Sequence, residues 1–158
     1  MSWLRALMLL ALIVWIGGIV FFAFVLAPTA FHVLPNTEAA ANVVGPSLTA
    51  LHWMGIVSGL VFLLCSLVCD FMRHSQVRLF SPAHVLILLM LGLTAISQFV
   101  ITPHLRVLRT EMKTAGPGAP PSPEFNRLHQ WSERTEGGVL LLGIVVVVLT
   151  ARRFDGRN

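Results

Sequence analysis

Four long runs of apolar residues alternate with short polar segments along the chain. They predict helices at about residues 3–26, 47–71, 82–105 and 124–151. A helix needs about 20 mainly apolar residues to cross the hydrocarbon core of a bilayer. The pattern therefore predicts an all-α protein, a four-helix transmembrane bundle that forms one integral membrane domain over residues 1–158.

Prolines and small polar residues mark the expected ends of these helices. Ala27-Pro28 is expected to end the first helix, and Pro46 suits the first turn of the second. Ser81-Pro82 and Ser122-Pro123 are each typical of an N-cap followed by a first-turn proline. The Pro- and Gly-rich segment 114–122 between the last two helices predicts a flexible loop.

Composition supports a lipid environment. Hydrophobic residues make up 56% of the chain and charged residues 11%, against about 25% charged residues in soluble domains. Membrane lipids are therefore expected partners of the exterior. The formal charge of +4 does not indicate nucleic-acid binding, because the basic residues lie at the ends of apolar runs and form no single patch.

The distribution of Lys and Arg predicts the orientation. With both termini in the cytoplasm, the inner side carries six basic residues, and the outer side carries five in one long loop that also holds four acids. Basic residues are enriched on the cytoplasmic side of membrane proteins. We therefore expect an N-in/C-in bundle.

The fourth helix has a short apolar stretch. Gly137 to Thr150 is 14 residues, which covers about 21 Å of a core roughly 30 Å thick. The polar turns before it must supply the missing length, so ionisable groups are expected inside the outer leaflet. Such groups are costly there and usually functional. Local thinning of the bilayer is the alternative.

Helical spacing predicts which polar groups face inward. The expected inward faces are His129–Ser132–Glu136 on the fourth helix, His52–Gly55–Gly59 on the second, and Thr94–Ser97–His104 on the third, with Gln98 alongside. They place His52, His104 and His129 in the outer half of the bundle. His84 lies toward the inner side, as an expected interface residue. Gly55 and Gly59 form a G-x-x-x-G that permits close helix approach.

This cluster predicts a binding site for haem b or a transition metal such as copper or zinc. Neutral imidazole is a good ligand for these groups, and bundle cores commonly house them. His52 and His129 would be the axial pair of a haem, with His104 close by. Alternatively, His52, His104, His129 and Glu136 would form a mixed metal site. A single histidine in a membrane helix, however, is more often a hydrogen-bonded packing residue.

Two other functions use the same residues. A permease for a small solute or ion would use Arg106 and Glu136 as gating charges, with Gln98 and Ser132 as further polar site residues, although no inverted repeat is present. A non-catalytic role as a structural or lipid-interacting subunit would need only paired polar groups, and Gly55–Gly59 leaves room for a homo-oligomer or a membrane-complex partner. No catalytic motif is found, so redox activity at a bound haem is the one enzymatic hypothesis left open.

Several short motifs occur in an order that resembles a known family. They are Trp15-x-Gly17 with Phe21-Phe22, Phe31-x-x-Leu34-Pro35, Leu51-His52, Pro103 to Arg106, and Phe125-x-x-x-His129-x-x-Ser132. Together they resemble the transmembrane protein 205-like family, a bacterial integral membrane domain of unknown function.

The resemblance implies a four-helix protein of the bacterial inner (plasma) membrane and singles out His52, Pro103, His129 and Ser132. That family often has Asn where this chain has Glu136, and an anion there would favour a cation.

Overall fold

The structure is a computed structural model that describes residues 2–74, 81–114 and 120–155. It is helical throughout, with no strand among the described residues. The elements are α1 (Ser2–Phe21), η1 (Phe22–Leu26), α2 (Ala27–Val33), α3 (Thr37–His74), α4 (Pro82–Ile96), η2 (Ser97–Ile101), α5 (Thr102–Thr114) and α6 (Pro123–Asp155). The two η elements are π-helical.

These elements join into four rods that are long and apolar enough to cross a membrane. The candidate spans are Ser2–Val33, Thr37–Met72, Pro82–Met112 and Pro123–Arg152. Large apolar side chains lie exposed on every rod, where lipid can cover them at low cost. The prediction of an all-α, four-helix transmembrane bundle is confirmed.

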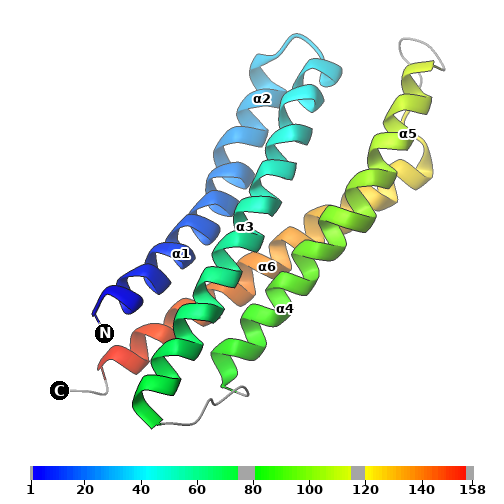
Figure 1. Cartoon of the computed structure of the whole chain (residues 1–158). Coiled ribbons are helices and arrows are strands. Elements are labelled where there is room, and N and C mark those ends of the chain that lie inside the picture. Colours follow the sequence, from blue (N-terminus) through cyan, green and yellow to red (C-terminus); the bar gives the residue numbers. More distant parts are fainter. Residues whose placement is uncertain (1, 75–80, 115–119, 156–158) are drawn as a thin grey trace.

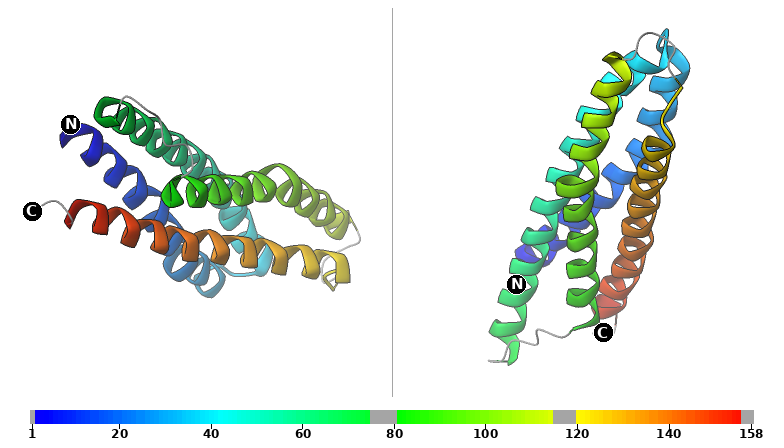
Figure 2. Two further views of the ribbon diagram at one scale, coloured as in Figure 1. Left: turned by 90° about the horizontal axis from the view of Figure 1, so that it is seen from below. Right: turned by 90° about the vertical axis from the view of Figure 1, so that its right-hand side faces the viewer.

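The rods pair into two arms. The first arm consists of α1, η1 and α2 packed on α3, and the second of α4, η2 and α5 packed on α6. Contacts of α3 with α4 and of α1 with α6 join the arms. Both termini lie at one end of the bundle, called here the terminal end (Figures 1 and 2). At the other end, called the open end, α2 and the start of α3 lie on one arm and α5 and the start of α6 on the other, and the two arms diverge (Figure 1).

The tightest packing centres on Trp15 of α1. Its indole is 1% exposed and lies against Gly55 and Gly59, where an added Cβ would come within 2.4 Å and 2.7 Å of the ring. Leu12, Phe62, Ile87 and Met90 are buried in the same core cluster. The G-x-x-x-G therefore permits close approach as predicted, but the partner is a tryptophan of the same chain.

The second span begins ten residues earlier than the sequence predicts. We expected a helix from residue 47 with Pro46 in its first turn, but α3 starts at Thr37 and Pro46 lies inside it. Asn36 caps this earlier start, since its Oδ1 accepts a hydrogen bond from the Ala39 amide at 2.8 Å. Helices in membranes tolerate an internal proline where neighbouring groups satisfy the freed carbonyl. The overlooked signal was the cap at Asn36, followed by the acid Glu38.

The first and third spans also continue past a proline. Pro28 was expected to end the first helix, and Pro103 was expected to lie near the end of the third. Pro28 follows the π-helical turn η1, in which the Ala27 amide bonds to the Phe22 carbonyl, five residues back. Proline has no N–H and its ring crowds the carbonyl four residues earlier. We attribute the wider turn to relief of this crowding. Pro103 stands in the same position after η2, so the third rod runs to Thr114 instead of residue 105.

The start of the last helix is as predicted. The Phe125 amide donates to Ser122 Oγ at 3.1 Å, which makes Ser122 the N-cap, and Pro123 is the first helical residue. Most of the expected loop 114–122 lies outside the described residues, since Thr114 still belongs to α5 and description resumes at residue 120.

Candidate functional site

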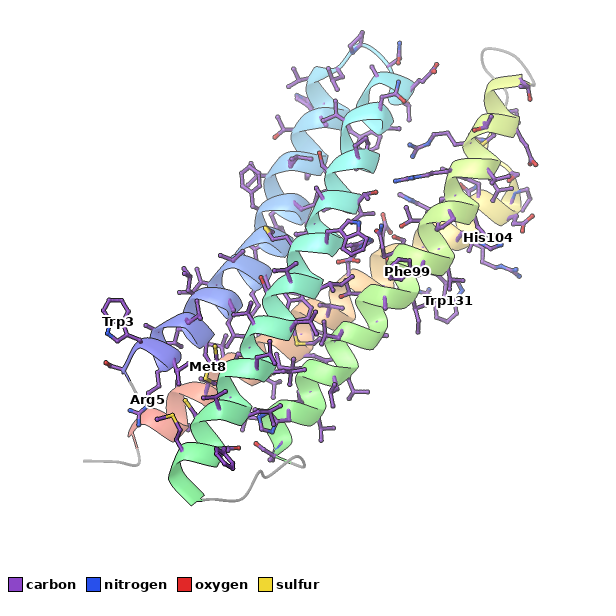
Figure 3. The ribbon with its side chains drawn as sticks, in the orientation of Figure 1. Trp3, Arg5, Met8, Phe99, His104 and Trp131 are labelled. Carbon is purple, nitrogen blue, oxygen red and sulfur yellow. The ribbon has the colours of Figure 1, made fainter. Side chains whose placement is uncertain are left out.

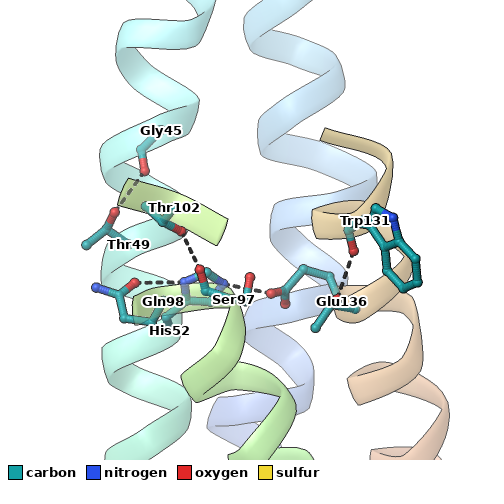
Figure 4. Close-up of polar contacts among 9 residues, drawn as sticks. Gly45, Thr49, His52, Ser97, Gln98, Thr102, Trp131 and Glu136 are labelled. Atoms are coloured by element: carbon teal, nitrogen blue, oxygen red, sulfur yellow. Dashed lines mark hydrogen bonds and ion pairs between the residues drawn. The ribbon is translucent and has the colours of Figure 1, made fainter. Parts of the chain in front are cut away.

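The candidate site is built around His52, which is 1% exposed in the middle of the bundle. Its Nδ1 lies 2.8 Å from Gln98 Oε1, and its Nε2 lies 2.7 Å from Glu136 Oε1 (Figure 4). The three side chains come from α3, η2 and α6, so they join both arms. We call His52, Gln98 and Glu136 the polar triad.

The triad can hold a proton in more than one arrangement. Gln98 Oε1 and an ionised Glu136 are both acceptors, so an imidazolium that donates from both ring nitrogens satisfies both contacts. If the Gln98 amide is turned so that its NH₂ group donates to Nδ1, a neutral ring satisfies both contacts as well. Two arrangements of hydrogens therefore satisfy both contacts of His52.

The π-helical turn η2 gives Gln98 its position. Thr102 Oγ1 donates to the Ser97 carbonyl at 2.8 Å and so satisfies an acceptor within the turn. The buried hydroxyls of Thr94 and Ser97 have no hydrogen-bond partner among the described residues. π-Helical turns inside α-helices occur frequently at functional sites. The turn thus carries Gln98 and the Ser97 hydroxyl, and the Thr94 hydroxyl lies one helical turn before Ser97 in α4.

A cavity of about 700 Å³ lies between the two arms toward the open end. Its apolar wall comes from the first arm and from α6. The residues of this wall are Ile19, Phe22, Ala23, Phe24, Ala27, Pro28, Phe31, Leu48 and Leu140. Arg106, Arg109, His129, Ser132, Glu133 and Glu136 give the second arm a polar lining. Glu136, which is 15% exposed, therefore joins the polar triad to the cavity.

Two arginines of α5 reach across the cavity to α3. Arg106 Nη2 donates to Thr49 Oγ1 at 2.8 Å, and Arg109 Nη1 donates to the Ala41 carbonyl at 3.1 Å. Thr49 Oγ1 in turn donates to the Gly45 carbonyl at 3.2 Å. These contacts bring two positive charges to one wall of the cavity.

The other predicted histidines lie apart from His52. His104 is exposed, and its Nδ1 donates to the Val100 carbonyl of its own rod at 2.8 Å, on the outside of the bundle (Figure 3). His129 is 52% exposed, lies 3.3 Å from Glu133 Oε1 and stacks on Phe125. It lines the cavity but does not join the triad. Ser132 is buried and faces the cavity with Glu136.

These positions do not fit the expected haem or metal site. No group of three or more His, Cys, Asp or Glu that could hold a metal ion occurs among the described residues. The set of His52, His104, His129 and Glu136 is therefore not assembled. Both ring nitrogens of His52 already face hydrogen-bonding partners, so an axial bond to haem iron would require one of them to be displaced.

Sequence reasoning missed Thr49, Gly45 and Arg109 as part of this site. Arg109 was assigned to the outer loop because the third helix was expected to end at residue 105. Thr102, Leu105, Arg106 and Arg109 follow the spacing of one helical face, and all four line the cavity. Continuing that helix by two turns would have revealed the second arginine.

Fold and site together define a four-span membrane protein with a buried polar triad beside a cavity between its two arms. The chain belongs to the family of a domain of unknown function, DUF4149, whose model matches residues 10–114. No curated protein and no solved structure gave a match to the chain.

The family match covers most of the site but not all of it. It contains His52, Gln98 and both arginines of the cavity wall, and it ends where α5 ends. Glu136 and the Phe125–Ser132 motif lie beyond it. The match agrees with the expected membrane domain of unknown function, but it does not support the narrower name transmembrane protein 205-like.

Proposed function

We propose that this protein binds a small amphiphile within the membrane, in the cavity between its two arms. The observation that carries the proposal is the cavity itself, whose volume of about 700 Å³ lies within the usual range for ligand sites. One wall is apolar and the other carries charged groups. This lining matches a ligand with a hydrocarbon part and a polar head.

The two arms give such a ligand a rigid frame. The polar triad joins the arms on the terminal side of the cavity, and so does the core cluster, in which Trp15 of α1 is buried together with Met90 of α4 and Val139 of α6. A membrane lipid could reach the cavity by lateral diffusion, without crossing water. The proposal thus develops the lipid-interacting role that the sequence left open.

For orientation, we propose that both termini are cytoplasmic, so that the cavity lies in the outer leaflet of the bacterial inner membrane. The excess of Lys and Arg on the terminal side supports this orientation, as does the position of both termini at one end (Figure 1). Labelling of single cysteines at residues 2 and 36 with a membrane-impermeant maleimide, in a Cys65→Ser/Cys69→Ser background, tests it. Only the cysteine at residue 36 should react in intact cells.

The binding proposal is tested by photolabelling in lipid nanodiscs. The probes are a diacylglycerol and its phosphate ester, each with a diazirine in one acyl chain. Cavity-lining peptides should be labelled to saturation at one probe per protein, whereas labelling of the lipid-facing surface should rise continuously with probe concentration. If neither probe gives saturable labelling in the cavity, the proposal is wrong.

Two glycines provide a matched pair of variants. A Cβ added at Gly137 or at Gly92 would meet nothing within 4 Å, but only Gly137 lines the cavity. Gly137→Leu should therefore fill part of the cavity and reduce the saturable labelling several-fold. Gly92→Leu makes the same change on α4, away from the cavity, and should leave that labelling intact. Equal effects of the two variants would contradict the proposal.

A second candidate is a permease for a small solute or ion, and one observation favours it. Glu136 lines the cavity while bonded to the buried His52, so a group that can exchange a proton lies at the cavity wall. Proton-driven uptake into proteoliposomes, lost in Glu136→Gln, would support this function. Absence of uptake for a panel of small cations and anions would leave binding as the function.

A further inference from the structure

We infer that the cavity selects an amphiphile whose head is a phosphate, recognised by Arg106 and Arg109. This inference rests on the proposed binding function and names the class of its ligand. Both side chains line the cavity. Guanidinium groups carry several N–H donors in a planar fork that suits oxyanions.

These arginines are not paired directly with acids. Neither Arg106 nor Arg109 lies within ion-pair distance of a carboxylate among the described residues, and their bonds go to neutral acceptors. Two acids also line the cavity, but neither contacts an arginine, since Glu133 lies beside His129 and Glu136 beside His52. The positive charge on this wall is therefore available to a ligand.

The two arginines are turned inward. An arginine near a helix end commonly extends to the membrane surface to reach water. Here both side chains instead cross to α3, where they contact neighbouring turns of that helix. Arg106 bonds to Thr49, and Arg109 Nη1 lies 3.1 Å from the position that a Cβ on Gly45 would take. A side chain at residue 45 would crowd the guanidinium, so glycine provides its space.

Spacing favours phosphate over carboxylate. Gly45 and Thr49 are one helical turn apart, about 6 Å along the axis, and they mark the positions of the two guanidinium groups. A tetrahedral phosphate presents oxygens in several directions and can bridge two such groups. A carboxylate has two coplanar oxygens, which suit a single guanidinium. An anion between the groups would also relieve the repulsion of like charges three residues apart on one helix.

A lipid headgroup and free inorganic phosphate share this chemistry. The apolar wall of the cavity favours the lipid, because an acyl chain can cover Phe22, Phe31 and Leu48 while the head lies between the arginines. Competition experiments distinguish the two sources. If millimolar inorganic phosphate displaces the lipid probe, the head site recognises the free anion as well.

The test compares the two diazirine probes, which differ only in the phosphate. Saturable labelling of the cavity by the phosphate ester should require at least tenfold less probe than labelling by the diacylglycerol. Arg106→Gln/Arg109→Gln should abolish this preference without abolishing labelling by the diacylglycerol. Arg134→Gln is the control, because this exposed arginine of α6 does not line the cavity.

The outcomes separate the inference from the proposed function. Equal labelling by both probes in the wild-type protein would overturn the phosphate head and leave the binding function standing. No saturable labelling by either probe would overturn both. The comparison of probes on the wild-type protein needs no variant, so it remains decisive if the double substitution impairs folding. Arg106→Lys/Arg109→Lys should retain part of the preference, because the charge is kept and the planar fork is lost.

Discussion

Two histidines in the part of the chain that the structure describes are almost completely buried, and their surroundings differ. His52 is 1% exposed and His84 is 2% exposed. His52 contacts an amide and a carboxylate from two other rods and lies beside the cavity. His84 Nε2 lies 2.6 Å from Ser66 Oγ, and His84 does not line that cavity.

This difference shows that burial of a histidine does not by itself indicate a functional site. A hydroxyl both donates and accepts, so Ser66 suits a neutral imidazole in either tautomer. His52 lies between a carboxylate and an amide, so one of its two partners can carry a charge. Nearby empty space then gives a ligand access to that charge, through Glu136. The predictions below test this contrast, from the largest expected effect to the smallest.

The largest effect is expected at His52. His52→Ala should lower the free energy of unfolding by about 4 kcal/mol, because it leaves the largely buried Glu136 without its partner and opens a hole in the bundle. Unfolding by SDS from mixed micelles measures this change. Adding Glu136→Leu to His52→Ala should recover much of the loss, because the unpaired carboxylate is removed. A double variant as unstable as the single one would show that the pair is not the cause.

At His84, a smaller loss of about 2 kcal/mol is expected. His84→Ala removes the buried hydrogen bond to Ser66 and some packing, and at that contact it leaves a hydroxyl instead of a carboxylate without its partner. The same SDS titration measures the loss, and photolabelling of the cavity should not change. If His84→Ala reduced cavity labelling as much as His52→Ala does, the two histidines would not be functionally distinct.

Most of the fold could be predicted from the sequence, because hydropathy and N-caps are local signals. Four apolar runs predicted the four rods, and Ser122 predicted the correct start of α6. The errors all came from treating proline as a helix boundary. Pro28, Pro46 and Pro103 all lie inside continuous rods. Whether proline ends a helix depends on turns and neighbours that supply or remove partners, and these depend on tertiary contacts.

The site was predictable where periodicity defined a helix face. That reasoning placed His52, Glu136 and Ser132 on inward faces, and the structure brings His52 and Glu136 into contact. It could not exclude His104, because the π-helical turn η2 shifts the inward face of the third rod, so that Thr102, Leu105 and Arg106 line the cavity and His104 lies outside. His129 keeps the predicted face but lies nearer the end, where the arms diverge. Divergence of two arms is a property of the whole bundle. A cavity that forms between the arms has no local sequence signal either.

Two glycines contrast the packed core with the cavity. A Cβ at Gly55 would meet the Trp15 ring, so Gly55→Ala should cost about 1.5 kcal/mol of unfolding free energy through overpacking. Gly137 faces open space, so Gly137→Ala should add about 0.5 kcal/mol, because alanine loses less backbone entropy in a helix. SDS titrations of both variants measure whether each substitution lowers or raises the free energy of unfolding. Destabilisation of similar size by both would mean that the region around Gly137 is packed like the core.

The smallest effect on stability, about 0.5 kcal/mol in either direction, is expected for Pro103→Ala. This substitution is informative because it is expected to change the orientation of the Gln98 side chain. An alanine at residue 103 restores an amide that can bond four residues back, so η2 can become an ordinary α-helical turn. A π turn holds one residue more than an α-helical turn. If η2 becomes α-helical, the helix before it rotates by about 100° relative to the helix after it, which would turn Gln98 away from His52.

A second substitution measures this rotation. In the wild-type background, Gln98→Leu should cost about 1 kcal/mol of unfolding free energy, because it leaves His52 Nδ1 unpaired. In the Pro103→Ala background the same substitution should cost close to nothing. Pro46→Ala is the control, because Pro46 lies within the α-helix α3, and there the cost of Gln98→Leu should remain about 1 kcal/mol. An unchanged cost in the Pro103→Ala background would mean that contacts with α3 and α6, and not the proline, position Gln98 in the triad.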